Sequence, residues 1–105
     1  MAKFFDFLFK KTPSWKFDQG PNTTAITTKQ VLDNHQSILR VLHYEDDHSW
    51  AFLCGTTNNP EDGRVISMSQ ALQIDPSLEE ISDLPPGWKA SRTSINAAWS
   101  KEKMS

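Results

Sequence analysis

The chain has 105 residues, a formal net charge of −2 and a hydrophobic content of 37%, which fit one ordinary domain with one core. Its only cysteine, Cys54, cannot form an internal disulfide. Since no segment approaches the roughly 20 apolar residues of a membrane span, we expect no transmembrane helix and a cytoplasmic protein.

The acidic residues are concentrated in the middle of the chain. Between Glu45 and Asp83 there are nine acids and one base, Arg64, whereas residues 84–105 carry four bases against one acid. Phosphate contacts need clustered Lys and Arg, so we expect no nucleic-acid partner. An acidic surface is better suited to attracting a basic protein.

The first residues are unusually rich in phenylalanine. Residues 3–10, KFFDFLFK, predict a short helix with a wide apolar face, within an N-terminal arm over residues 1–14. Its apolar run is short, is broken by Asp6 and has no small-residue cleavage site, which argues against a signal peptide. We expect the arm to pack on the domain, or on a second copy in a homodimer. A weak contact with a membrane surface is the alternative, although a helix this short buries too little apolar area for stable anchoring.

A strand and a helix are expected next. Residues 24–26 follow a Gly-Pro-Asn turn signal and predict a short strand. Thr27 and Gln30 have the spacing of a capping box, in which each side chain bonds to a backbone N–H at the start of a helix. A short helix is therefore predicted over about 28–34.

Two apolar runs, residues 37–44 and 49–54, flank the polar segment 45–48 and predict a β-hairpin. On the second strand one face carries Trp50, Phe52 and Cys54, and the other carries Ala51 and Leu53. Because both faces are apolar, we expect this strand to be central and covered on both sides.

The remaining elements are short. Residues 64–66 predict a third strand, Ser67 and Gln70 repeat the capping-box spacing before a second helix, and residues 76–82 predict a further helical turn. Residues 88–92 alternate apolar and polar side chains, as an edge strand does.

We therefore divide the chain into the arm at 1–14, a single domain at 15–94 and a polar tail at 95–105, whose last residues we expect to fray. Strands and helices that do not alternate regularly predict an α+β fold, a small, mainly antiparallel sheet with two to three short helices packed on it.

The hairpin stretch HYEDDHSWAFLCG, residues 43–55, raises the question of a metal site. His43 and His48 flank the turn and can approach each other, but the paired Cys and His spacing of structural zinc is missing. A calcium loop needs more oxygens and a turn glycine. We expect a solvated turn without metal or cofactor; a regulatory module that binds a small molecule or metal near residues 43–50 is the alternative.

Catalysis has equally weak support in the sequence. Cys54 with His43 or His35 would be a nucleophile pair, but Cys54 shares a strand face with aromatics, where cysteine is usually an inert apolar residue. Asp46 and Asp47 share one exposed environment, so their pKa values are not pushed apart as acid–base catalysis needs. We expect no catalytic residue and a protein that is not an enzyme.

Protein binding is the function that the sequence favours. Acids in loops are candidates for contacts with a basic protein. Trp99, in the polar tail, either packs back on the domain or contacts a partner, since tryptophan is enriched at interface hot spots. The predicted partner-binding residues are Glu45, Asp46, Asp47, Glu61, Asp62 and Trp99, and the acidic segment 79–83 belongs to the same surface.

The segment 49–55, SWAFLCG, resembles the W-x-F-x-(S/C)-G motif of small, mostly uncharacterised bacterial proteins related to immunity proteins of polymorphic-toxin systems. V-I-S-M at 65–68, D-P-S-L at 75–78 and P-G-x-x-x-x-R at 86–92 follow in a similar order. The likeness covers about residues 15–92. It implies an α+β domain without a known enzyme activity and, for some relatives, neutralisation of a toxin. It transfers no binding site and does not account for the arm.

Overall fold

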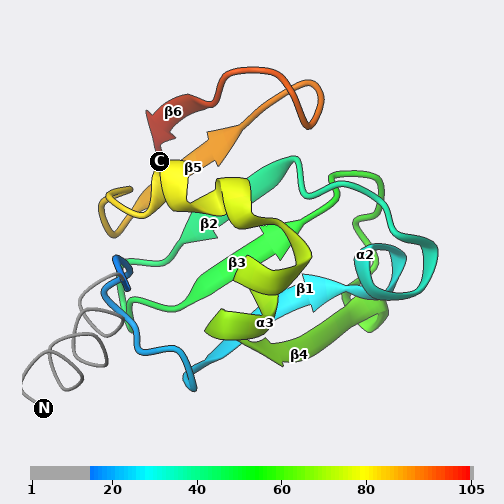
Figure 1. Cartoon of the computed structure of the whole chain (residues 1–105), viewed down its shortest axis with the longest axis horizontal. Coiled ribbons are helices and arrows are strands. Elements are labelled where there is room, and N and C mark those ends of the chain that lie inside the picture. The colour runs from blue at the N-terminus through cyan, green and yellow to red at the C-terminus, as the bar shows by residue number, and fades with distance from the viewer. Residues whose placement is uncertain (1–14, 105) are drawn as a thin grey trace, which may run out of the picture.

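A six-stranded sheet with helical segments on one face makes up the domain in this computed structural model, which describes residues 15–104 (Figure 1). The strands are β1 (Thr24–Thr28), β2 (Arg40–His43), β3 (Trp50–Leu53), β4 (Gly63–Ser67), β5 (Trp88–Ser91) and β6 (Ser100–Lys103). Their order is β4-β1-β3-β2-β5-β6, and every neighbouring pair is antiparallel except β1 and β3. The predicted α+β class is confirmed. The predicted arm lies outside the described residues.

Four helical segments are interspersed among the strands: α2 (Lys29–Asn34), η2 (Pro60–Asp62), α3 (Met68–Ile74) and η3 (Pro76–Ile81), of which η2 and η3 are 3₁₀ segments. The capping box predicted at α3 is present, since Ser67 Oγ accepts from Gln70 N–H and Gln70 Oε1 accepts from Ser67 N–H. The longest described helix has seven residues, so none of the helices in this part of the chain can span a bilayer.

The helix cap predicted at Thr27 is wrong by one residue. The cap of α2 is Thr28, whose hydroxyl accepts from Val31 N–H at 3.4 Å. Thr27 is still part of β1, points into the core, and donates its hydroxyl to the Phe52 carbonyl at 2.7 Å. The strand therefore runs two residues further than expected, because a buried threonine can satisfy its hydroxyl across the sheet.

The core lies between the sheet and the helices. As predicted, β2 and β3 form an antiparallel hairpin, and β3 is central, between β1 and β2. Trp50 and Phe52 are buried on its helical face, and the Phe17 ring packs edge-on against both, at centroid distances of 5.0 and 6.4 Å. Phe17 thereby fixes the entry segment, residues 15–23, against the sheet. The helices above contribute Met68, Ala71, Leu78 and Ile81 to the same core.

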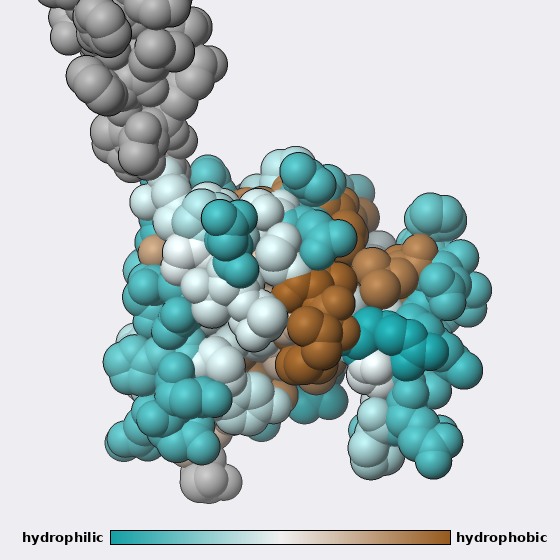
Figure 2. Space-filling model, turned by 90° about the horizontal axis from the view of Figure 1, so that it is seen from below, coloured by the Kyte–Doolittle hydropathy of each residue, from teal (hydrophilic) through white to brown (hydrophobic). Residues whose placement is uncertain are grey.

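The opposite face of the sheet is only partly covered, which corrects the expectation for β3. Ala51 is buried there, but Ile26 and Val65, which pair across β1 and β4, are 41% and 68% exposed. Viewed from the side of β4, hydrophobic surface forms a band between hydrophilic flanks (Figure 2). β3 is thus apolar on both sides, yet the described helices cover one face.

Residues 100–104, which we expected to fray, are ordered in the sheet or hydrogen-bonded to it. Ser100–Lys103 forms β6, so β5 lies inside the sheet and is not the edge strand. Lys89 and Glu102 pair across the two strands at 3.7 Å, and Met104 N–H donates to the Gly87 carbonyl. A charged strand at an edge resists pairing with other chains, so a polar sequence here is compatible with strand structure.

Candidate functional site

The turn between β2 and β3 is an ordered, acidic loop. Tyr44 N–H donates to the Ser49 carbonyl, Asp46 accepts from the Asp47 N–H, and Asp47 accepts from the Ser49 N–H at 3.0 Å. These bonds from Ser49 lower the pKa of Asp47 below its ordinary value. Asp46 and Asp47 thus fix the backbone of the turn, and Glu45, Asp46 and Asp47 all face solvent.

His43 points from β2 into the core beneath that turn. Its side chain is 2% exposed and stacks on the Trp50 ring at a centroid distance of 3.9 Å. Nδ1 lies 2.7 Å from the Leu84 carbonyl oxygen, and Nε2 lies 3.0 Å from Asp18 Oδ2. Both ring nitrogens of this buried histidine therefore face oxygen acceptors.

Asp18 joins the two histidines that sequence reasoning placed across the hairpin. Its Oδ1 accepts from Trp50 Nε1–H at 2.8 Å, and its Oδ2 lies 3.5 Å from His48 Nδ1 as well as near His43. One potential ligand atom from each of Asp18, His43 and His48 lies within 4.8 Å of the others. The sequence analysis missed Asp18, although its position directly after Phe17, a core aromatic, is the signal that could have found it.

Cys54 is a buried residue beyond the end of β3. Its Sγ lies 3.4 Å from Thr28 Oγ1 and 3.1 Å from Thr56 Oγ1. Burial raises the pKa of the thiol, but these hydrogen bonds lower it by more. His43 is at the other end of the hairpin, paired with Trp50. His35 lines a surface pocket together with Cys54, but within residues 15–104 no hydrogen bond joins them.

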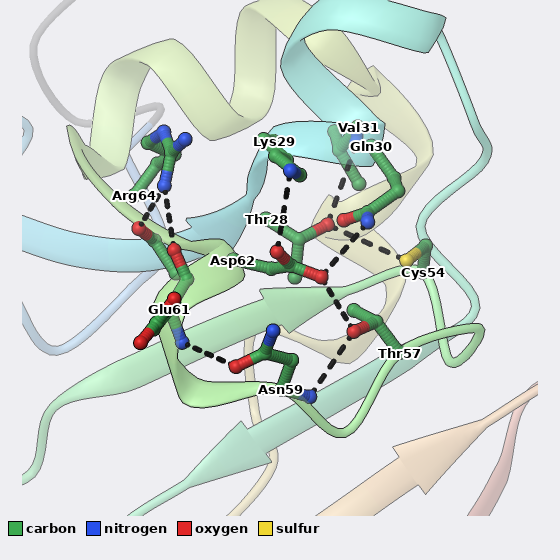
Figure 3. Close-up of polar contacts among 11 residues, drawn as sticks. Thr28, Lys29, Gln30, Val31, Cys54, Thr57, Asn59, Glu61, Asp62 and Arg64 are labelled. Atoms are coloured by element: carbon green, nitrogen blue, oxygen red, sulfur yellow. Dashed lines mark hydrogen bonds and ion pairs between the residues drawn. The ribbon is translucent and has the colours of Figure 1, made fainter.

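Asp62 is not free to meet a partner. Its carboxylate is buried and accepts from Thr57 Oγ1–H at 2.6 Å and from Gln30 Nε2–H at 3.0 Å, with Lys29 Nζ at 3.5 Å (Figure 3). The Thr57 and Gln30 hydrogen bonds, and the Lys29 charge, lower its pKa against the opposing effect of burial. Asp62 therefore ties η2 to α2, and only its neighbour Glu61 points to solvent.

Trp99 also has an internal role. It lies over the Arg92 guanidinium, 4.1 Å from the ring centre to Cζ. Beneath it Arg92 forms a buried ion pair with Asp75 and donates to the Ile38 carbonyl. The tryptophan thus covers a buried charge, as cation–π stacking favours, and is half-buried.

The predicted partner-binding residues do not form one surface. His43 pairs with Trp50 and Trp88 at the hairpin end of the sheet, whereas Arg40 pairs with Leu53 and Ser91 at the opposite end. Glu45, Asp46 and Asp47 lie in the turn at the first end. The loop that holds Glu61 and Asp62 follows β3, and the loop that holds Trp99 follows β5. Both strands finish at the opposite end of the sheet, so the predicted set is divided between the two ends.

No protein-family model, curated protein or solved structure matches this chain. The resemblance to immunity proteins therefore stays a prediction from the sequence motif. In the fold, the motif is a strand with alternate inward residues: Trp50, Phe52 and Cys54 are buried, and Gly55 follows with a positive φ of 79°.

Proposed function

We propose that this chain is a non-enzymatic protein-binding domain that meets a basic partner with the hairpin end of its sheet. The observation that carries the proposal is the β2–β3 turn. Glu45, Asp46 and Asp47 are exposed, and none of them has an ion-pair partner within residues 15–104. Three adjacent charges on a rigid turn attract a cationic surface and raise its association rate.

Apolar surface next to the turn supports the same function. Tyr44, 38% exposed, alternates with His43 and therefore lies on the helix-free face of the described sheet, as Leu42 does. Ile26 and Val65 extend this surface toward β4. Exposed apolar surface framed by polar residues is typical of protein contact sites. In the proposed complex the acids raise the association rate and orient the partner, and burial of the apolar band contributes to the binding free energy.

A role in neutralising a toxin is the finer form of this proposal. Its support is the motif at residues 49–55 together with the acidic turn, because an acidic inhibitor suits a basic toxin. The partner expected is a folded protein with a basic surface.

The test is the association rate of a partner captured under native conditions and then purified. The variant Glu45→Gln, Asp46→Asn, Asp47→Asn keeps side-chain oxygens for the turn but removes three charges. The control Asp33→Asn, Glu61→Gln, Glu80→Gln removes three exposed charges elsewhere. We expect the turn variant to slow association at least about tenfold at low salt and to flatten its salt dependence.

Equal slowing by the two variants would mean that net charge alone matters. Association that neither variant changes would contradict the proposal. Circular dichroism of both variants checks that each keeps its fold.

A further inference from the structure

His43 has more hydrogen-bond acceptors around it than a neutral imidazole can serve. A neutral ring carries one N–H, so it can donate from Nδ1 to the Leu84 carbonyl or from Nε2 to Asp18, and not to both. With the N–H on Nδ1, Nε2 presents a lone pair to Asp18 Oδ2 at 3.0 Å, and two lone pairs that face each other in a buried site are unfavourable. A proton or a metal ion between these two atoms relieves this.

The position of His48 favours a metal ion over a proton. His48 Nδ1 lies 3.5 Å from the same oxygen, and its ring is 5.9 Å from that of His43. A single proton on His43 serves one nitrogen, whereas a metal ion serves all three ligand atoms at once. We propose that Asp18, His43 and His48 bind a divalent transition metal of the zinc type.

The spacing of the ligand atoms fits such an ion. Zinc bonds of about 2.0 Å in a tetrahedron place neighbouring ligand atoms about 3.3 Å apart. The distances from Asp18 Oδ2 to His43 Nε2 and His48 Nδ1, 3.0 and 3.5 Å, lie on either side of that value. The third separation, between the two imidazole nitrogens, is within 4.8 Å, and the exposed His48 ring would close on the ion to bring it to the same value.

The surrounding contacts orient two of the ligands. The Leu84 carbonyl holds the His43 proton on Nδ1 and so leaves Nε2 free for a metal. Trp50 Nε1–H donates to Asp18 Oδ1, which leaves Asp18 Oδ2 to bind the same metal ion as His43 Nε2. Ligating histidines and carboxylates in metalloproteins usually have such hydrogen-bonded supports.

His48 completes the site from the turn. It has a positive φ of 60°, which is uncommon for a residue other than glycine, and is 52% exposed. Asp18 is 38% exposed, so the fourth position of a tetrahedral ion opens to solvent. The neighbouring acids of the turn attract cations to this end of the sheet.

The ligand set selects the kind of metal. Two imidazoles and one carboxylate suit zinc and its neighbours in the first transition row. Calcium and magnesium prefer all-oxygen sites with more ligands, and we expect neither to compete at physiological excess.

The test is calorimetric titration of Zn²⁺ into tag-free, chelator-treated protein, with His48→Asn as the site variant and His35→Asn as its control. His35 is also exposed and has a positive φ, 56°, so asparagine is equally tolerated at both positions. We expect one Zn²⁺ per chain, affinity at least about 100-fold weaker in the His48 variant, and no change in the control. Co²⁺ should give the strong visible absorption of tetrahedral coordination.

Failure of the wild-type chain to bind one equivalent, or equal binding by the two variants, would overturn the proposal. The contact between His43 and Asp18 would then be a hydrogen bond that only supports the fold. Thermal melts of both variants confirm folding, and the result is independent of the partner-binding experiment, because the turn acids are intact in both.

Discussion

Two polar contacts of buried side chains, Arg92 with Asp75 and His43 with Asp18, differ in how completely their hydrogen-bond donors and acceptors are matched. Arg92 has five N–H groups, and they meet Asp75, Ser77 and two backbone carbonyls, with the Trp99 ring above.

His43 and His48, by contrast, share one oxygen of Asp18, and His43 faces acceptors on both sides. Donors matched to acceptors indicate a structural pair. Acceptors in excess of donors indicate a place for a cation. The two ends of this domain illustrate both cases.

The largest effect is expected at the matched pair. Arg92→Ala leaves the buried Asp75 carboxylate without its counter-ion, and such a loss costs about 3–5 kcal/mol in the free energy of unfolding. Urea denaturation measures it. The double variant Arg92→Met, Asp75→Asn removes both charges, keeps a side-chain oxygen to accept from the Ser77 N–H, and should recover part of the loss.

A loss below about 1 kcal/mol in the single variant would contradict this structural role, since that is the range of a solvent-exposed ion pair.

A smaller effect, on Zn²⁺ affinity, is expected at the contact between His43 and Asp18. Trp50→Phe removes the N–H that orients Asp18 while keeping an aromatic ring in the core. Zn²⁺ affinity should fall about 10–100-fold. Trp88→Phe changes a core-packed tryptophan on β5 and serves as the control, with affinity unchanged.

Equal affinities for the two tryptophan variants would mean that the indole N–H does not orient a metal ligand, and would remove the main support for Asp18 as one. Thermal unfolding separates any general loss of stability from the change in affinity.

The smallest effect concerns Asp62, at the end of the sheet where the carboxylate is satisfied by the chain itself. Because its folded-state pKa is lowered, it stabilises the fold above its unfolded pKa, about 4, and this stability is lost as the pH falls through the lowered folded-state value. Asp62→Asn should flatten that acid limb of stability below about pH 4. Melting temperatures across this range measure it, and an unchanged acid limb would contradict the role given to Asp62.

Local signals in the sequence were sufficient for most elements. The Ser67–Gln70 capping box, the hairpin and the helical turn predicted over residues 76–82 each depend on residues within a few positions of one another. β6 was missed because its residues, SKEK, are charged and form a strand only through pairing with β5.

The site itself was only half predictable. His43 and His48 are close in sequence, but Asp18 joins them from 25 residues before His43, through packing of the entry segment that no local pattern encodes. Asp62 was predicted to face solvent because loop acids usually do. Its donors, Gln30 and Thr57, come from two other segments and bury it.

The most direct test of the contrast between the two pairs is nitrogen NMR of the imidazole rings during Zn²⁺ addition. We predict that His43 Nε2 and His48 Nδ1 take on metal-bound shifts at one equivalent, while His43 Nδ1 keeps its proton and His35 does not change. Protons retained on both His43 nitrogens in the presence of Zn²⁺ would contradict the account, because the pair with Asp18 would then be complete without a metal.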